Sequence, residues 1–274
     1  MPELPEVETV RRGLEHWSLG RSIVKAQTFH PRATNPRSLA TISSLKGARI
    51  TALSRRGKFL WFELDRPQAL VAHLGMSGQF RIQDQTFPKE KHLRARLLLD
   101  SERELRFIDQ RTFGWLAVSE MNGEVPDLVR AIAPDIFDAA FDPSDFTQRI
   151  RSKRTEIKRA LLDQNLMSGV GNIYADESLW LAKIHPQTQC DSLTKPKIKS
   201  LLSAVESVMS KALLEGGTSF DSLYTNVNGE SGYFEHSLEA YGRENENCSR
   251  CDTQIRRIIV GGRSSHFCPR CQRL

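Results

Sequence analysis

The 274-residue sequence predicts an α+β protein built from several domains, and three observations carry this prediction. After one short amphipathic helix, the first half of the chain breaks into short β-rich pieces separated by turn residues. Beyond a connection punctuated by prolines at 126–144, the apolar pattern becomes helical. Four of the five cysteines then lie near the C-terminus. We therefore expect domains at 1–130, 131–236 and 237–274.

Composition and charge exclude several classes of protein. Hydrophobic residues make up 39% of the chain and charged residues 26%, as in ordinary globular domains. No apolar run approaches the roughly 20 residues of a membrane span, and the N-terminus lacks the apolar core of a signal peptide. We expect a cytoplasmic protein with no membrane contact. Seven arginines and three acidic residues from position 243 onward carry +4 of the net charge of +6, which favours a polyanionic partner.

The first domain is predicted to be an antiparallel β-sandwich preceded by a helix. The helix covers Glu6–His16, where apolar residues recur at spacings of three and four. Eight strand candidates follow, most of them separated by turn residues as in a sandwich or barrel. They are Ser22–Phe29, Ala48–Ser54, Lys58–Leu64, Ala69–Leu74, Gln79–Gln83, Arg94–Leu99, Leu105–Asp109 and Trp115–Ser119.

The second domain is predicted to be helical, with a long glycine-rich segment after it. The helices are expected at Phe146–Ile150, Thr155–Asp163, Asn172–Leu181 and Lys195–Glu215. The segment 216–242 has no periodicity and is too long for a simple connection, which favours a functional loop.

The C-terminal cysteines have the spacing of a structural zinc site. Cys248 and Cys251 form one Cys-x-x-Cys pair, Cys268 and Cys271 form a second, and sixteen residues separate the pairs. Four thiolates complete a tetrahedral Zn²⁺ site and leave no position for water, so the metal is predicted to be structural. Cys190 stands alone and is interpreted as a small buried side chain.

Between the two pairs, the sequence predicts a β-hairpin. Ile255–Val260 has the pattern of a strand, Gly261 and Gly262 of a turn, and Arg263–Phe267 of the return strand. Arg263 then lies near the tip as either a solvated charge or a phosphate clamp, and the basic tail favours the clamp.

The N-terminus offers a possible nucleophile. If Met1 is removed, Pro2 carries a free secondary amine, and an α-amino group has a pKa of roughly 8 against about 10.4 for lysine. Such an amine can form an iminium ion with a sugar carbon. While Met1 is attached, the Pro2 nitrogen is an amide and cannot attack. The alternative is that Pro2 and Pro5 only stiffen the chain before a helix.

Two further stretches have the residue types of a DNA-binding surface. In the stretch 153–180, Gly169 and Gly171 permit a tight double turn, and Asn172 is expected to cap the next helix. Backbone N–H groups there, with nearby lysines, suit a phosphate. Met76 and Phe113 would ordinarily be core residues, but their glycine-rich surroundings favour loop tips, where an apolar wedge can hold open a base stack.

Taken together, the motifs resemble those of the bacterial formamidopyrimidine-DNA glycosylases (8-oxoguanine-DNA glycosylase/AP lyases) from end to end. The resemblance rests on PELPEVETVRRGL, RRGKFLWFEL, HLGMSG, DQRTFG, GVGNIYADESLWLAKIHP, GGTSF, GESGYF and the four cysteines. It implies a β-sandwich with a leading helix, a helix-two-turn-helix at Lys153–Leu181, and a DNA-binding zinc finger. The run Leu4-Pro5-Glu6-Val7-Glu8 favours the branch that excises purines.

The resemblance also implies roles for individual residues. Pro2 would attack C1′ of the damaged nucleotide, with Glu3 as proton donor and base. Lys58 would donate a proton in β-elimination and contact phosphate, and Arg263 would assist δ-elimination. The DNA-contact positions are Met76, His92, Arg111, Phe113, Lys153, Lys158 and Asn172, with Arg111 facing the orphaned cytosine.

Two segments complete the comparison with the family pattern. The region 218–241 matches the mobile loop that closes over the flipped base. Where the family often has Lys-His-acid-His, this chain has Lys91-His92-Leu93-Arg94, which leaves open the role of the second imidazole.

The expected function is base-excision repair by a monomer associated with the nucleoid. The substrate would be duplex DNA containing oxidised purines, 8-oxoguanine and formamidopyrimidines, or abasic sites, and the strand would be cut by β,δ-elimination. Two alternatives stay open: a zinc-finger DNA-binding protein without catalysis, and a glycosylase of the same fold that prefers oxidised pyrimidines.

Overall fold

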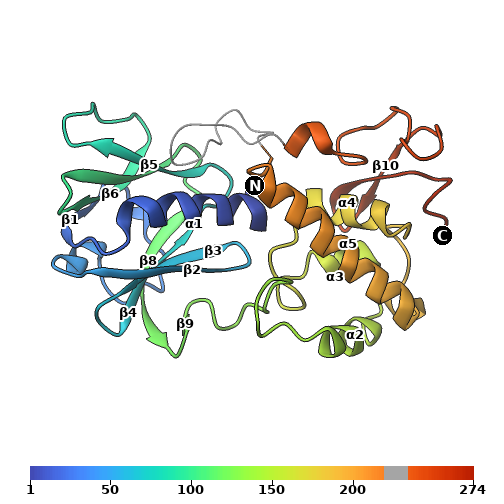
Figure 1. Ribbon diagram of the computed structural model, residues 1–274, viewed down its shortest axis with the longest axis horizontal. Helices are drawn as coiled ribbons and strands as arrows, with labels where there is room; N and C mark the ends of the chain where they lie inside the picture. Colours follow the sequence, from blue (N-terminus) through green and yellow to red (C-terminus); the bar gives the residue numbers. More distant parts are fainter. Residues whose placement is uncertain (219–233) are drawn as a thin grey trace. The chain divides into compact units, whose positions relative to one another are not determined.

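The computed structural model describes residues 1–218 and 234–274, and the chain divides into two compact units (Figure 1). Unit 1 comprises Met1–Ala131 with Glu215–Tyr233, and unit 2 comprises Ile132–Leu214 with Phe234–Leu274. Within the described residues, no helix is long and apolar enough to cross a membrane.

Unit 1 begins with helix α1, Leu4–Ser18, which starts two residues earlier than expected. The backbone N–H of Glu3 donates to Glu6 Oε2 at 2.8 Å, and Pro5 occupies the first turn, where a missing N–H removes no helical hydrogen bond. Val7, Val10 and Leu14 are buried in the core of the unit, as the apolar spacing predicts.

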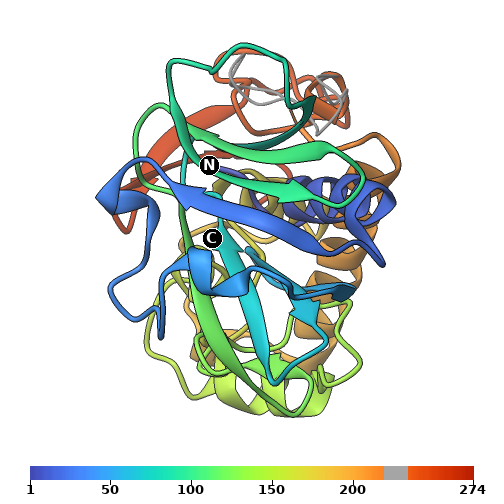
Figure 2. The ribbon, with the colours of Figure 1, turned by 90° about the vertical axis from the view of Figure 1, so that its left-hand side faces the viewer.

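Two antiparallel sheets, β1-β6-β7-β5 and β2-β3-β4-β8-β9, make up the rest of unit 1 (Figure 2). One buried cluster contains apolar side chains from both sheets and from α1, which confirms the predicted sandwich with a leading helix. The strands are Ile23–Thr28 (β1), Ile50–Arg56 (β2), Phe59–Leu64 (β3), Gln68–His73 (β4), Gly78–Asp84 (β5), Leu93–Leu99 (β6), Arg103–Asp109 (β7), Trp115–Asn122 (β8) and Val125–Pro126 (β9). All eight candidates are strands, and β9 was not predicted.

Unit 2 contains the predicted helices. They are Pro143–Arg151 (α2), Ile157–Leu161 (α3), Asn172–Leu181 (α4) and Lys195–Leu214 (α5), with short 3₁₀ turns elsewhere. Helix α3 is shorter than its predicted span because Glu156 is extended, with φ −65° and ψ 141°, and Leu162 closes the helix. One face of α5 is buried, as its apolar spacing predicts.

The C-terminal hairpin also forms as predicted. Strands β10, Arg256–Val260, and β11, Arg263–Phe267, pair antiparallel with Val260 opposite Arg263. The two turn residues, Gly261 and Gly262, have φ of 56° and 77°, as a two-residue hairpin turn of this kind requires.

Candidate active site and nucleic-acid interface

The residues predicted for catalysis in unit 1 lie directly before α1 and in the turn between β2 and β3. Pro2 and Glu3 are buried at the start of α1, and Lys58 is 7% exposed in the turn. Glu8 Oε2 accepts from Arg55 Nε at 3.2 Å, which joins α1 to the end of β2. Burial alone would raise the pKa of Glu8, but the neighbouring arginines outweigh it and lower that pKa. The ion pairs therefore fix the helix against the strand that leads to Lys58.

Glu6 has a second role that its sequence position did not reveal. Its side chain is buried, and Oε1 accepts from the backbone N–H of Thr218 at 2.8 Å and from its hydroxyl at 3.1 Å. A Cβ added at Gly217, whose φ is +82°, would lie 2.9 Å from the same oxygen. Because Oε2 holds the N–H of Glu3, Glu6 links the N-terminus to 217–218. The rest of the predicted loop, 219–233, lies outside the described residues.

His73, at the end of β4, was not singled out from the sequence although it begins the HLGMSG motif. Its Nδ1 accepts from the N–H of Gly75 at 3.2 Å, and its ring stacks on Trp115 at 5.8 Å between centroids. Burial, and then the charge of Lys58, lower the pKa of His73 to about 4. A neutral imidazole at neutral pH can therefore act as the acceptor that fixes the turn before Met76.

Two turns of unit 1 present the predicted wedge residues. Met76 is 40% exposed and Phe113 is 59% exposed, which confirms that both lie at loop tips and outside the core. Arg111 is exposed in the same turn as Phe113. A Cβ added at Gly75, whose φ is +60°, would lie 2.4 Å from the carbonyl carbon of Phe113. The two turns thus pack backbone against backbone, and only glycine fits there.

Arg94, the departure from the family pattern, contacts a predicted DNA-contact residue. Its Nε donates to the carbonyl oxygen of Asp109 at 2.7 Å, and its Nη2 lies 3.5 Å from His92 Nδ1. The guanidinium therefore lies beside the imidazole of His92.

In unit 2, Lys158 is fully buried. Its Nζ donates to Asp176 Oδ1 at 2.6 Å and to the carbonyl oxygen of Ser264 at 2.6 Å. Asp176 also accepts from the Ser265 hydroxyl at 2.9 Å and from the N–H of His266 at 2.8 Å. These bonds join α3 and α4 to β11. The predicted contact of Lys158 with DNA stays a prediction, and it would require the ammonium to exchange these partners.

Lys153 precedes α3, and Asn172 follows the turn that joins α3 to α4. Asn172 is the first residue of α4, and Gly171 is the N-cap, so the prediction that Asn172 caps the helix is wrong. The backbone of Gly171 is extended, with φ −128°, so the helix itself begins at Asn172, and α4 has the bounds expected from the sequence. Within the described chain, the buried Oδ1 of Asn172 has no hydrogen-bond partner. Lys153 Nζ pairs with Asp163 Oδ2 at 2.9 Å on the surface.

Arg263 is exposed at the start of β11, directly after the hairpin turn. In the part of the chain that the structure describes, its side chain makes no hydrogen bond or ion pair. A guanidinium exposed at the end of a hairpin turn can contact a phosphate with two parallel hydrogen bonds.

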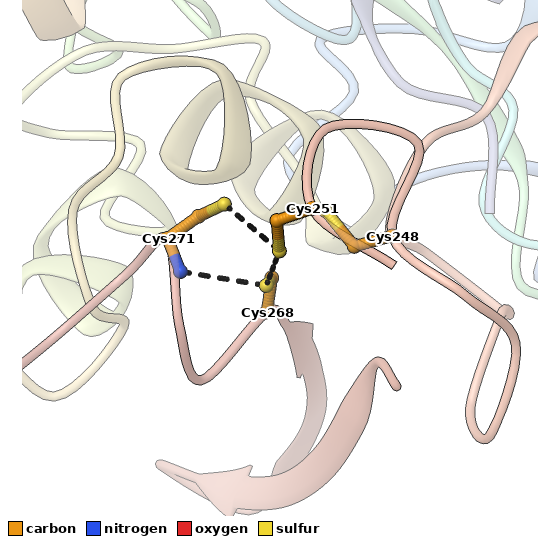
Figure 3. A group of neighbouring side chains, drawn as sticks. All are labelled: Cys248, Cys251, Cys268 and Cys271. Atoms are coloured by element: carbon orange, nitrogen blue, oxygen red, sulfur yellow. Dashed lines mark hydrogen bonds between the residues drawn. The ribbon is translucent and has the colours of Figure 1, made fainter. Parts of the chain in front are cut away.

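The four C-terminal cysteines converge from the two sides of the hairpin (Figure 3). Their sulfur atoms all lie within 4.8 Å of one another, with Cys251 Sγ 3.4 Å from Cys268 Sγ. Four thiolates around Zn²⁺ at about 2.3 Å place the sulfurs about 3.8 Å apart, so the cluster fits one structural zinc. Cys190 is fully buried, as predicted, and burial raises its pKa to about 11.

The chain is similar to known proteins over its whole length. The family model for the formamidopyrimidine-DNA glycosylase N-terminal domain matches residues 1–116, the H2TH domain of the same enzymes matches 132–223, and the zinc finger found in FPG and IleRS matches 245–274.

Individual relatives cover nearly the complete chain. A formamidopyrimidine-DNA glycosylase of Nocardioides sp. is 54% identical over 99% of this chain and 94% of that protein. A crystal structure of a Lactococcus lactis FPG mutant with DNA containing Fapy-dG has a TM-score of 0.88 at 35% identity, with both chains fully covered. The wild-type Lactococcus lactis protein with DNA containing an oxidised pyrimidine has a TM-score of 0.89 at 36% identity, again with full coverage. This chain belongs to the formamidopyrimidine-DNA glycosylase family.

Proposed function

We propose that the protein excises oxidised purines from duplex DNA and then cuts the strand at the abasic site. Family membership over the full chain supports the glycosylase activity. The observation that carries the chemistry is the burial of Pro2 and Glu3 at the start of α1, in the unit that also holds the buried Lys58. The crystallised relative bound to Fapy-dG DNA supports the class of lesion.

The first step is base excision by the N-terminal amine. After removal of Met1, the lone pair of the Pro2 nitrogen forms a bond to C1′, and the bond from C1′ to the base nitrogen breaks. Glu3 then protonates O4′ as the bond from C1′ to O4′ opens, and the proton that the amine loses neutralises the departed base anion. The product is an iminium ion between Pro2 and the opened sugar.

The second step is elimination. The iminium makes the C2′ proton acidic, and its removal breaks the bond from C3′ to its oxygen. A second elimination removes the C4′ proton and breaks the bond from C5′ to its oxygen, so both phosphates leave. In this scheme Lys58 donates a proton and binds phosphate, and Arg263 binds the other phosphate.

DNA engagement would use both units. Met76 and Phe113 enter the stack where the damaged base leaves it, and Arg111 faces the unpaired cytosine. Phosphate contacts come from His92, Lys153, Lys158 and Asn172. The zinc ion holds the hairpin that presents Arg263 and takes no part in the reaction. We propose further that the protein is a cytoplasmic monomer that associates with the nucleoid through DNA.

Borohydride trapping tests this mechanism. Wild-type protein whose N-terminal residue is Pro2 by sequencing should form a covalent adduct with duplex DNA that contains 8-oxoguanine. Pro2→Gly should weaken trapping, and Glu3→Gln should slow base excision more than cleavage of a preformed abasic site. Glu15→Gln on the same helix is the matched control. A wild-type protein that forms no adduct would contradict the proposal.

The same assay with a lesion panel separates the purine and pyrimidine alternatives. Duplexes that contain 8-oxoguanine, formamidopyrimidine or thymine glycol opposite each of the four bases should be cut fastest for the two purine lesions. A preference for thymine glycol would instead assign the protein to the pyrimidine class.

A further inference from the structure

We infer that Asp109 is a positioning residue that holds three turns of unit 1 in one arrangement, an inference that rests on the proposed function. They are the turn 75–77, which carries Met76, the turn that leads into β6 at 92–94, which carries His92, and the turn 111–114, which carries Arg111 and Phe113. We call them the probing turns. Asp109 is the last residue of β7 and is fully buried.

The carboxylate of Asp109 joins two of the probing turns. Its Oδ1 accepts from the hydroxyl of Ser77 at 2.5 Å and from the N–H of Arg111 at 3.1 Å. Its Oδ2 accepts from the N–H of Gly114 at 2.7 Å. The Ser77 hydroxyl also accepts from the N–H of Arg111 at 3.0 Å. The turn that carries Met76 and the turn that carries Phe113 are therefore both hydrogen-bonded to the same carboxylate.

The backbone of Asp109 joins the third probing turn. Its N–H donates to the carbonyl oxygen of His92 at 3.0 Å, and its own carbonyl oxygen accepts from Arg94 Nε at 2.7 Å. Each hydrogen-bonding group of this residue is thus directed at a turn that carries a proposed DNA contact. Arg94 supplies one of these bonds, which gives the departure from the family pattern a structural role.

A role in fold stability alone does not account for this carboxylate. Burying a charge is costly, and an apolar side chain of similar size often stabilises a fold equally well. In the described residues the Asp109 carboxylate forms no ion pair, and all its partners are in the turns. The turns are also tightly packed, since a Cβ at Gly114 would lie 2.9 Å from the carbonyl oxygen of Leu74. A small displacement of one turn must therefore move the others.

Asp109→Asn tests the inference because it replaces one carboxylate oxygen with an NH₂ group. That group is a donor and cannot accept from the Ser77 hydroxyl or from the N–H groups of Arg111 and Gly114. The matched control is Asp84→Asn, at the exposed end of β5, where Asp84 pairs with Arg103 at 2.8 Å. Two substrates separate positioning from chemistry: duplex DNA with 8-oxoguanine opposite cytosine, and a single strand with a preformed abasic site. Only the duplex has a base stack to hold open and an orphaned base to contact.

For Asp109→Asn we expect single-turnover excision from the duplex to fall about 10- to 100-fold. Cleavage of the single-stranded abasic site should stay within about twofold of wild type. The fluorescence rise of 2-aminopurine placed beside the lesion, which reports unstacking, should be lost in parallel. Asp84→Asn should change none of these signals.

Equal losses on both substrates, or no loss on the duplex, would overturn the inference. If Asp109→Asn does not fold, Ser77→Ala removes one bond of the network and should show the same selective loss to a smaller degree. An unchanged Ser77→Ala would then overturn it. A wild-type protein without excision activity would be a failure of the proposed function, which these outcomes distinguish.

Discussion

The probing turns of unit 1 and the β10–β11 hairpin of unit 2 each present an exposed arginine, Arg111 and Arg263, but they are stabilised in different ways. The probing turns extend from strands of a sandwich whose large apolar core includes both sheets. The hairpin has a small cluster of five buried residues, two of which are cysteines. Polar bonds therefore only set the geometry of the turns, whereas the hairpin depends on its metal site and on Asp176 for its structure.

Zinc removal should have the largest effect of the changes considered, because it should disrupt the hairpin and leave the sandwich intact. Structural zinc in small finger domains contributes apparent binding energies of about 10–16 kcal/mol, so a chelator or Cys268→Ala should disorder the hairpin. Amide hydrogen exchange should increase throughout β10 and β11, and DNA affinity should fall, while exchange in the sandwich strands stays unchanged. Metal analysis should find one zinc per chain in wild type.

Cys190→Ala is the matched control for zinc removal because this thiol is buried and separate from the cluster. It should retain one zinc. If chelation also increased amide hydrogen exchange in the sandwich strands, the two units would not differ in their dependence on zinc.

Asp176→Asn should have the next largest effect. The change leaves the Lys158 ammonium buried without its carboxylate, and breaking a buried pair from one side costs about 3–5 kcal/mol. Hydrogen exchange of the β11 amides measures the loss. Asp163→Asn, which removes the surface pair with Lys153, should cost about 1 kcal/mol or less. Similar costs for the two variants would contradict a structural role for the buried pair.

His73 should make the stability of unit 1 depend on pH, and this effect should be smaller than the two above. Its folded pKa of about 4 lies below the ordinary value of 6.5, so the unfolded state binds the proton more tightly. The contribution of His73 to the free energy of unfolding is complete above pH 6.5 and is lost as pH falls toward 4. The loss amounts to about 2 kcal/mol at about pH 5. Urea unfolding of wild type and His73→Asn at about pH 5 and about pH 7.5 checks this. A parallel slope in the variant would exclude His73 as the cause.

Local patterns predicted much of the molecule. Alternation and turn residues placed eight strands, and the spacing of the cysteines predicted the metal site that the sulfur positions fit. The glycines beside Met76 and Phe113 correctly indicated that these two side chains lie outside the core. These signals are local because they depend on residues a few positions apart.

The buried carboxylates could not be predicted in the same way. Asp109, Asp176 and Glu6 all lie within motifs that the resemblance rests on, yet each also holds at least one group that is distant in the sequence. Asp109 is 32 positions from Ser77. Glu6 is 212 positions from Thr218, and Asp176 is 90 positions from His266. Glu177 similarly accepts N–H groups from 239–241 and gained no role from its sequence position.

The sequence by itself determined the α+β class, the order of the elements, the zinc ligands and the family. Only the tertiary structure decided which acidic residues organise the turns and the hairpin, and which predicted DNA contact, Lys158, is buried in an ion pair. The physical reason is that periodicity and metal spacing are properties of neighbouring residues. The partners of a buried charge, in contrast, are chosen by which distant backbone and side-chain donors the fold brings within hydrogen-bonding distance.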